Sequence, residues 1–220
     1  SIKNFNIGFG ASVNGMPLEL GQTGIFPFTN HSNDIYNIQT LRYIISDITI
    51  HADDDTKLLL DEVHFVDLSI DSTLTLTIPE IILNKQYTSI SFTMGLDSTK
   101  NITNLFLNEN FFPSFAWPDI LGGGYHYMQL EGDFNTVFNG YATHTGPTNG
   151  IDFSFSKTFS IYINNRNSIY IMMEIPNWYQ NPEILNFTTN GIMGNINSQE
   201  ILRTNGIEDV FYLWTSESLK

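Results

Sequence analysis

The 220-residue sequence contains no cysteine. Without thiolates the chain cannot form disulfides, iron–sulfur clusters or the usual cysteine-based structural zinc sites. Basic residues are also scarce, because nine Lys and Arg stand against 23 Asp and Glu, a formal net charge of −14. Such a chain repels phosphate backbones and has no charge attraction to anionic lipid, which argues against nucleic-acid binding. We interpret the acidity first as a solubility feature.

Long apolar runs are missing as well. No run approaches the ~20 residues that span a bilayer. The chain starts at Ser1, just before a predicted strand and without a signal-peptide pattern, as a processed protein would. Apolar residues make up 41% of the chain and are spread along its whole length, which predicts a globular protein with a substantial core. No linker or internal repeat is visible, so we predict one domain over residues 1–220.

Short alternations of apolar and polar residues dominate the pattern and predict strands at 5–9, 41–51, 63–70, 73–78, 87–96, 160–163, 168–175 and 209–214. The segment 41–51 is the best candidate for a central strand, since it is rich in β-branched and aromatic residues and lacks Gly and Pro. Asn14-Gly15 predicts a tight turn, and Asp71-Ser72 predicts a hairpin between 63–70 and 73–78. A short helix is predicted at 197–204, ending at Gly206. Together these features predict an all-β fold, an antiparallel β-sandwich with long loops and one short helix near the C-terminus.

The residues best suited to form a chemical site lie between positions 117 and 146. Trp117, Met128 and two of the five histidines, His126 and His144, lie in this stretch. If 125–130 is a strand, His126, Met128 and Leu130 share one face, with imidazole and thioether roughly 7 Å apart at the backbone. An antiparallel return would bring His144 back beside this strand. Two imidazoles and a thioether suit a soft ion, above all Cu(I), so the stretch is a candidate copper site.

Ordinary structural roles compete with this hypothesis. A histidine on a half-buried strand commonly bonds the backbone, and a methionine beside it is commonly core filler. Trp117 would then be an aromatic plug in a loop. The run Gly122-Gly123-Gly124 is followed by neither Lys nor a helix start, so it predicts a bend or bulge and not a phosphate-binding loop.

Seven landmarks in order resemble the MbnP-like copper-binding domain family of exported bacterial proteins, named for a methanobactin-associated member. Two of them lie in the candidate site, Gly124-Tyr125-His126-Tyr127-Met128-Gln129-Leu130-Glu131-Gly132 and His144-Thr145-Gly146, and the others are segments 14–18, 41–48, 63–68, 90–97 and 205–211. The resemblance therefore covers most of the chain. No single landmark is specific, but their order is.

The resemblance implies an antiparallel β-sandwich and export to the periplasm or cell surface, often with a lipid-anchored N-terminus. In the better-understood relatives, copper is bound by two histidines and by a kynurenine made from tryptophan, and a dihaem peroxidase-like partner performs the oxidation. Carried over, His126 and His144 are the ligands and Trp117 is the residue to be oxidised. Many members have two closely spaced tryptophans, whereas here Phe115 takes the first place and 118–123 lengthen the gap. Met128 is our own candidate for a substitute soft ligand.

Two functions are carried forward from the sequence. The first is an exported, non-enzymatic protein that holds Cu(I) for copper acquisition, storage or transfer. The alternative is a metal-free β-sandwich that binds a partner protein or a glycan through aromatic loops at Trp117, Trp178 and Tyr179. A hydrolase would need paired carboxylates in a cleft, and no motif demands one.

Overall fold

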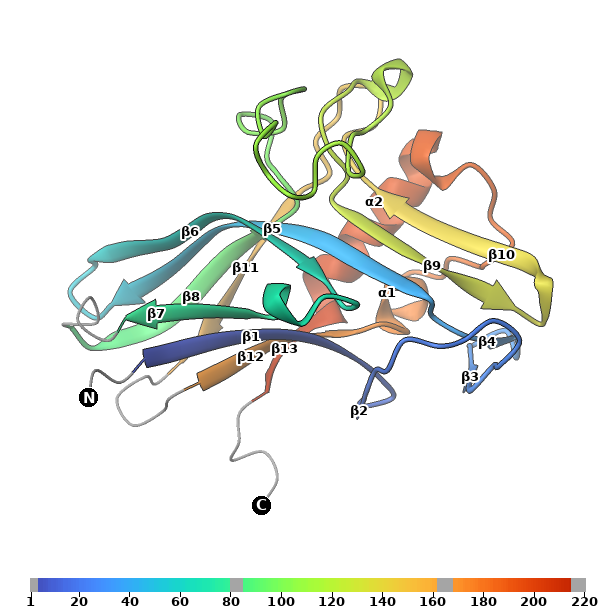
Figure 1. The fold of residues 1–220 in the computed structure, drawn as a ribbon, viewed down its shortest axis with the longest axis horizontal. Helices are drawn as coiled ribbons and strands as arrows, with labels where there is room; N and C mark the ends of the chain where they lie inside the picture. Colours follow the sequence, from blue (N-terminus) through green and yellow to red (C-terminus); the bar gives the residue numbers. More distant parts are fainter. Residues whose placement is uncertain (1–3, 80–84, 162–167, 215–220) are drawn as a thin grey trace.

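The computed structural model describes residues 4–79, 85–161 and 168–214, which form two facing β-sheets with a loop layer over the larger one (Figure 1). The strands are β1 (Asn4–Val13), β2 (Met16–Pro17), β3 (Phe28–Thr29), β4 (Ile35–Tyr36), β5 (Thr40–Ala52), β6 (Lys57–Asp67), β7 (Thr75–Pro79), β8 (Tyr87–Met94), β9 (Met128–Phe134), β10 (Thr136–Thr145), β11 (Phe155–Ser160), β12 (Ser168–Glu174) and β13 (Phe211–Trp214). The helical elements are η1 (Asp71–Thr73), η3 (Asp119–Leu121), α1 (Asn177–Gln180), η4 (Ile192–Gly194), α2 (Ile196–Asn205) and η5 (Gly206–Val210).

The two sheets are built mainly from antiparallel pairs. The smaller has the order β13-β12-β1-β2, with β7 also on β1, and the larger has the order β11-β8-β5-β9-β4-β3, with β6 on β5 and β10 on β9. One parallel pair joins β1 to β12. Large apolar side chains from both sheets fill the space between them. The predicted all-β sandwich is confirmed, and the Asn14-Gly15 turn is confirmed by positive φ angles at both residues.

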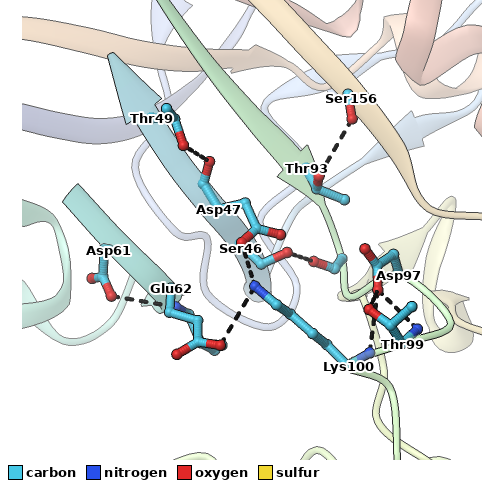
Figure 2. Close-up of polar contacts among 12 residues, drawn as sticks. Ser46, Asp47, Thr49, Asp61, Glu62, Thr93, Asp97, Thr99, Lys100 and Ser156 are labelled. Carbon is cyan, nitrogen blue, oxygen red and sulfur yellow. Dashed lines mark hydrogen bonds and ion pairs between the residues drawn. The ribbon is translucent and has the colours of Figure 1, made fainter. Parts of the chain in front are cut away.

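Strand β5 is the central strand that its composition predicts. It pairs with β6 along one edge, and along the other with β9 through 40–43 and then with β8 through 45–52. The pairing with β8 is interrupted shortly after it begins by a bulge at Asp47, whose φ is 54°. Figure 2 shows how this bend is fixed: Lys100, on the loop after β8, reaches the carboxylate of Asp47 and lies 3.6 Å from that of Glu62.

Alternation along β5 also explains why the larger sheet is covered on both faces. Tyr43 and Ile45 point into the core between the sheets. Ile44 points the other way, into a second apolar cluster with Leu96, Phe111, Phe115 and Tyr125 that we call the loop-side cluster. Residues of the segment between β8 and β9 supply most of this cluster, and that segment rises above the sheet in Figure 1.

Two local predictions are wrong. Residues 63–70 and 73–78 do not form a hairpin, since β6 belongs to the larger sheet and β7 to the smaller. The Thr73 hydroxyl donates to the carbonyl oxygens of Asp67 and Ile70, and this closes η1 as a crossover between the sheets. The strand predicted at 160–163 is observed up to Ser160, within β11, and its positions 162 and 163 lie outside the described residues.

The predicted C-terminal helix is confirmed as α2, and the side chain of Asn195 accepts a hydrogen bond from the Ser198 amide at its start. Gly206 does not end the helical path, because the chain continues through the π-helical turn η5. Glycine is needed there for packing, since a Cβ would lie 2.3 Å from Cζ of Phe155 and 2.8 Å from Cζ3 of Trp178. Within the described ranges, no helix is long and apolar enough to cross a bilayer.

Candidate metal site

The site begins with two short segments, 115–117 and 124–126, that pair antiparallel beneath the loop layer. The amide of Trp117 donates to the carbonyl of Gly124 at 2.8 Å, and the amide of His126 donates to that of Phe115 at 2.8 Å. The chain turns between them through three glycines with positive φ, 117°, 70° and 88° at positions 122–124, so the predicted bend is confirmed. The pairing brings Trp117 against His126, with ring centroids 4.7 Å apart and planes at 79°.

His144 joins them from β10. This strand returns antiparallel to β9 and places His144 directly opposite Gln129. The imidazoles of His126 and His144 lie with centroids 5.1 Å apart and planes at 76°. The structure therefore brings together Trp117, His126 and His144, and the approach of His144 to His126 is the one that an antiparallel return predicts.

Each histidine has one ring nitrogen anchored by an oxygen. Nδ1 of His126 lies 3.1 Å from the carbonyl oxygen of Phe115, and Nε2 of His144 lies 2.6 Å from Oε1 of Glu131. If each anchored nitrogen carries the proton, Nε2 of His126 and Nδ1 of His144 keep a lone pair. This is the arrangement of metal-binding histidines, in which a carbonyl or carboxylate fixes the tautomer of the ligand.

Burial keeps His126 in its neutral form. Its surroundings lower its pKa from 6.5 to about 4, with desolvation as the largest cause and the charges of His144 and Arg42 as smaller ones. The hydrogen bond from His144 holds the pKa of Glu131 below its ordinary value. A metal ion at His126 would therefore compete with protons only in acid solution.

Trp117 is 2% exposed, and its indole Nε1 has no hydrogen-bond partner. Its six-membered ring lies on the backbone of Gly146, where a Cβ would approach Cε3 to 2.5 Å. A surface pocket of about 430 Å³ borders it from the loop side, lined also by Thr103, Pro113 and Tyr125. A buried N–H without a partner is unusual and marks the position as one that packing alone does not explain.

Met128 lies away from this group. Strand β9 starts at Met128, after a bend at Tyr127, so the alternation that would place His126 and Met128 on one face is interrupted, and that prediction is wrong. Met128 pairs with Tyr43 and is fully buried in the core between the sheets. Gln129, its neighbour, is the residue that faces His144.

Arg42, Gln129 and Glu131 complete the site and were not predicted from the sequence. Arg42, Gln129 and His144 stand directly opposite one another on β5, β9 and β10. The Arg42 guanidinium donates to Oε1 of Gln129, whose Nε2 donates to the carbonyl of Ser114 at 3.2 Å. Alternation could have predicted Gln129 and Glu131 as face-mates once β9 was in place, but Arg42 is 87 positions away from Gln129.

The donors at this site suit some metals and not others. Among the described residues, no group of three or more His, Asp or Glu side chains is placed to hold a metal ion. This disfavours calcium, which takes six to eight oxygen ligands, and leaves a zinc ion short of the three or four protein ligands it usually has. Two imidazoles in an apolar setting, each with one ring nitrogen not anchored by an oxygen, fit Cu(I), a soft monovalent ion that accepts few ligands.

The aromatic residues proposed for the alternative function are not at the surface. Trp117, Trp178 and Tyr179 are 2%, 1% and 4% exposed. Trp178 packs with Phe155 and Phe211, and Tyr179 packs with Tyr141 and Phe187. The rings of Trp178 and Tyr179 are committed to the interior, so the prediction that they contact a partner or glycan is wrong, whereas Trp117 borders the surface pocket.

Comparison with known proteins identifies the family and the fold. The family model MbnP matches residues 2–197. Among solved structures, MbnP from Methylosinus trichosporium superposes with a TM-score of 0.62 over 98% of this chain and 99% of that chain, at 9% sequence identity, which shows a shared fold. No curated protein matches. The chain belongs to the MbnP family.

Proposed function

We propose that this MbnP-family chain is a non-enzymatic copper-binding protein that holds Cu(I) between His126 and His144. The observation that carries the proposal is the histidine pair itself, with ring centroids 5.1 Å apart and one nitrogen of each ring anchored by an oxygen. The methanobactin association of the family supports copper as the metal. Acquisition, storage or transfer of copper would each use such a site.

The surroundings of the pair favour a soft ion of low charge. His126 is 6% exposed, and the rings of Phe115 and Trp117 lie against it, with centroids 5.5 Å and 4.7 Å away. Water, which a hard divalent ion would keep as ligands, is largely displaced by these rings. Two imidazole nitrogens can satisfy Cu(I) in this setting, and a third soft donor would strengthen the site.

Trp117 is our proposed source of that third donor, after oxidation to kynurenine by the dihaem peroxidase-like partner implied by the family resemblance. Three features support it: contact with His126, an indole N–H without a partner, and a pocket bordering the ring. The conversion changes the chain mass by a few daltons, so intact-mass measurement on protein from its native host tests it. An unmodified mass with copper bound would leave the two histidines as the only protein ligands.

Export is a further part of the proposal. Family resemblance implies the periplasm or cell surface, with attachment through an N-terminal lipid. Fractionation of the native host with detection of this chain tests it, and recovery in the cytosolic fraction would contradict it.

The histidine assignment is tested by equilibrium dialysis with Cu(I) under anaerobic, reducing conditions. A His126→Ala/His144→Ala variant should lose the bound copper, since both anchored ligands are gone. His31→Ala is the matched control, because His31 is exposed and bonds only Asn186 at 3.1 Å among the described residues. Wild-type stoichiometry in the double variant would disprove the site. Absence of metal from the wild-type protein, by elemental analysis after copper supplementation, would favour a metal-free binding protein.

A further inference from the structure

Arg42 is a half-buried cation beside the histidine pair, and no ion pair with a described residue neutralises it. Nine basic residues serve the whole chain, yet one of them lies here. Within the part of the chain that the structure describes, no carboxylate comes within ion-pair distance of its guanidinium, and its Nε is buried without a hydrogen-bond partner. Leaving a buried charge without a counter-charge costs stability, so this arrangement calls for an explanation.

Two carboxylates lie near Arg42, and neither forms an ion pair with it among the described residues. Asp67 stands opposite Arg42 on β6, but its Oδ1 accepts hydrogen bonds from the amide and hydroxyl of Ser69. Glu131 bonds His144 at 2.6 Å. The guanidinium donates instead to the neutral amide of Gln129, and its Cζ lies 5.9 Å from the centroid of the Phe115 ring.

The positive charge therefore acts on the histidine pair. Gln129 separates Arg42 from His144 in a direct cross-strand row, and Phe115 separates Arg42 from His126. With the histidines neutral, the nearby charges are the carboxylates of Glu131 and Asp67 and the guanidinium of Arg42, which stands between Asp67 and the histidines in the strand order. A divalent ion adds two positive charges beside Arg42, whereas a monovalent ion adds one.

We propose that Arg42 is a specificity-determining residue that selects monovalent copper over divalent ions at the histidine pair, an inference that rests on the proposed function. It acts by through-space repulsion, which grows with the charge of the bound ion. Arg42 and an ion at the histidines would lie about two strand spacings apart. At that separation in a half-buried setting, one additional unit of charge on the ion lowers its affinity by about tenfold or more. Selection against divalent ions would matter because Zn²⁺ also binds imidazole pairs.

The test compares Cu(I) and Zn²⁺ affinities, each by competition with a chromophoric chelator, in wild type, Arg42→Met and Arg42→Lys. Met keeps the length of the side chain without its charge, and Lys keeps the charge without the planar fork. We expect the preference for Cu(I) over Zn²⁺ to fall about tenfold or more in Arg42→Met and to be largely kept in Arg42→Lys. An unchanged preference in Arg42→Met would overturn the proposal while leaving copper binding by the histidines intact.

A metal-free measurement separates charge from positioning. The Gln129 amide links Arg42 to Ser114, so loss of Arg42 could instead loosen the segment that carries Phe115 and Trp117. Hydrogen exchange at the His126 amide, which donates to Phe115, reports on that segment without metal. Equal protection in wild type and Arg42→Met is expected. Faster exchange in both Arg42→Met and Arg42→Lys, with an equal loss of the preference for Cu(I) over Zn²⁺, would show a positioning role and overturn charge selection. A wild-type protein that bound neither ion would overturn both this proposal and the proposed function.

Discussion

Two polar clusters flank strand β5. In one the charged and polar groups are paired, and in the other two of them are buried without partners. The cluster in Figure 2 matches Lys100 with Asp47 and Glu62, while Asp97 accepts hydrogen bonds from the amide and hydroxyl of Thr99. The histidine site leaves Nε1 of Trp117 and Nε of Arg42 buried without partners. Tyr43 Oη and Trp178 Nε1 in the core between the sheets are also buried without partners, so orphaned groups alone do not mark a site. What sets the second cluster apart is that its orphaned groups lie beside two imidazoles whose rings are 5.1 Å apart, each anchored through one nitrogen. The first cluster is therefore scaffold and the second is the candidate site.

The largest effect is expected on the unfolding free energy in acid solution, and it comes from His126 in the candidate site. Its folded pKa of about 4 lies below the ordinary 6.5, so the unfolded chain binds a proton first as pH falls. The contribution of neutral His126 is therefore present above pH 6.5 and is lost between pH 6.5 and 4. A shift of this size corresponds to about 3 kcal/mol of unfolding free energy.

Urea unfolding of the metal-free protein at several pH values measures this effect. Carboxylates contribute to the acid slope too, so the informative quantity is the difference between wild type and His126→Asn, which keeps an N–H donor toward Phe115. The variant should lack part of the slope between pH 6.5 and 4, and the exposed control His31→Asn should retain it. Parallel curves for wild type and His126→Asn would mean that His126 is not held neutral by burial.

Gly146→Ala should disturb the candidate site and leave the scaffold cluster alone. Its Cβ would meet Cε3 of Trp117 at 2.5 Å, so the indole must move away from its place beside His126. Overpacking of this kind costs about 1–3 kcal/mol, and Cu(I) affinity should fall with it. Gly194→Ala is the control, because its Cβ would lie 3.6 Å from Cδ2 of Leu121, an ordinary contact. Urea denaturation and Cu(I) competition measure the two effects, and equal behaviour of both variants would contradict the proposed packing of Trp117.

Lys100→Met should disturb the scaffold cluster and leave the candidate site unchanged. Burial disfavours the Lys100 charge, but the hydrogen bond and charge of Asp47, helped by Glu62, raise its pKa overall. The side chains of Lys100 and Asp47 are 20% and 35% exposed, so water screens the pair and the loss should be about 1 kcal/mol or less. Cu(I) affinity should stay at the wild-type value. Loss of copper binding in this variant would show that the bend in β5 and the site are coupled.

The sequence predicted what depends on local pattern and missed what depends on interruptions of it. Strand β5 followed from its β-branched residues, and the approach of His144 to His126 followed from an antiparallel return. Met128 was misplaced because the bend at Tyr127 lies between it and His126, and a side-chain alternation rule holds only within an unbroken strand. Arg42 could not be found at all, since its place opposite Gln129 is set by strand pairing between distant segments.

Substitution of Met128, which the sequence analysis placed on the wrong face, should have the smallest effect on stability and on Cu(I) affinity. It tests whether Met128 belongs to the core or to the site. Met128 is fully buried between the sheets, opposite Tyr43 and Thr145, while Gln129 beside it faces the histidines. Met128→Leu nearly conserves volume, so it should cost less than about 1.5 kcal/mol of unfolding free energy. Because leucine has no sulfur, a thioether ligand would be lost completely, yet we expect Cu(I) affinity to change less than about twofold, well under 1 kcal/mol. A tenfold loss of Cu(I) affinity with unchanged stability would place the thioether at the metal. The side chain of Met128 would then have to point toward the histidines when copper binds.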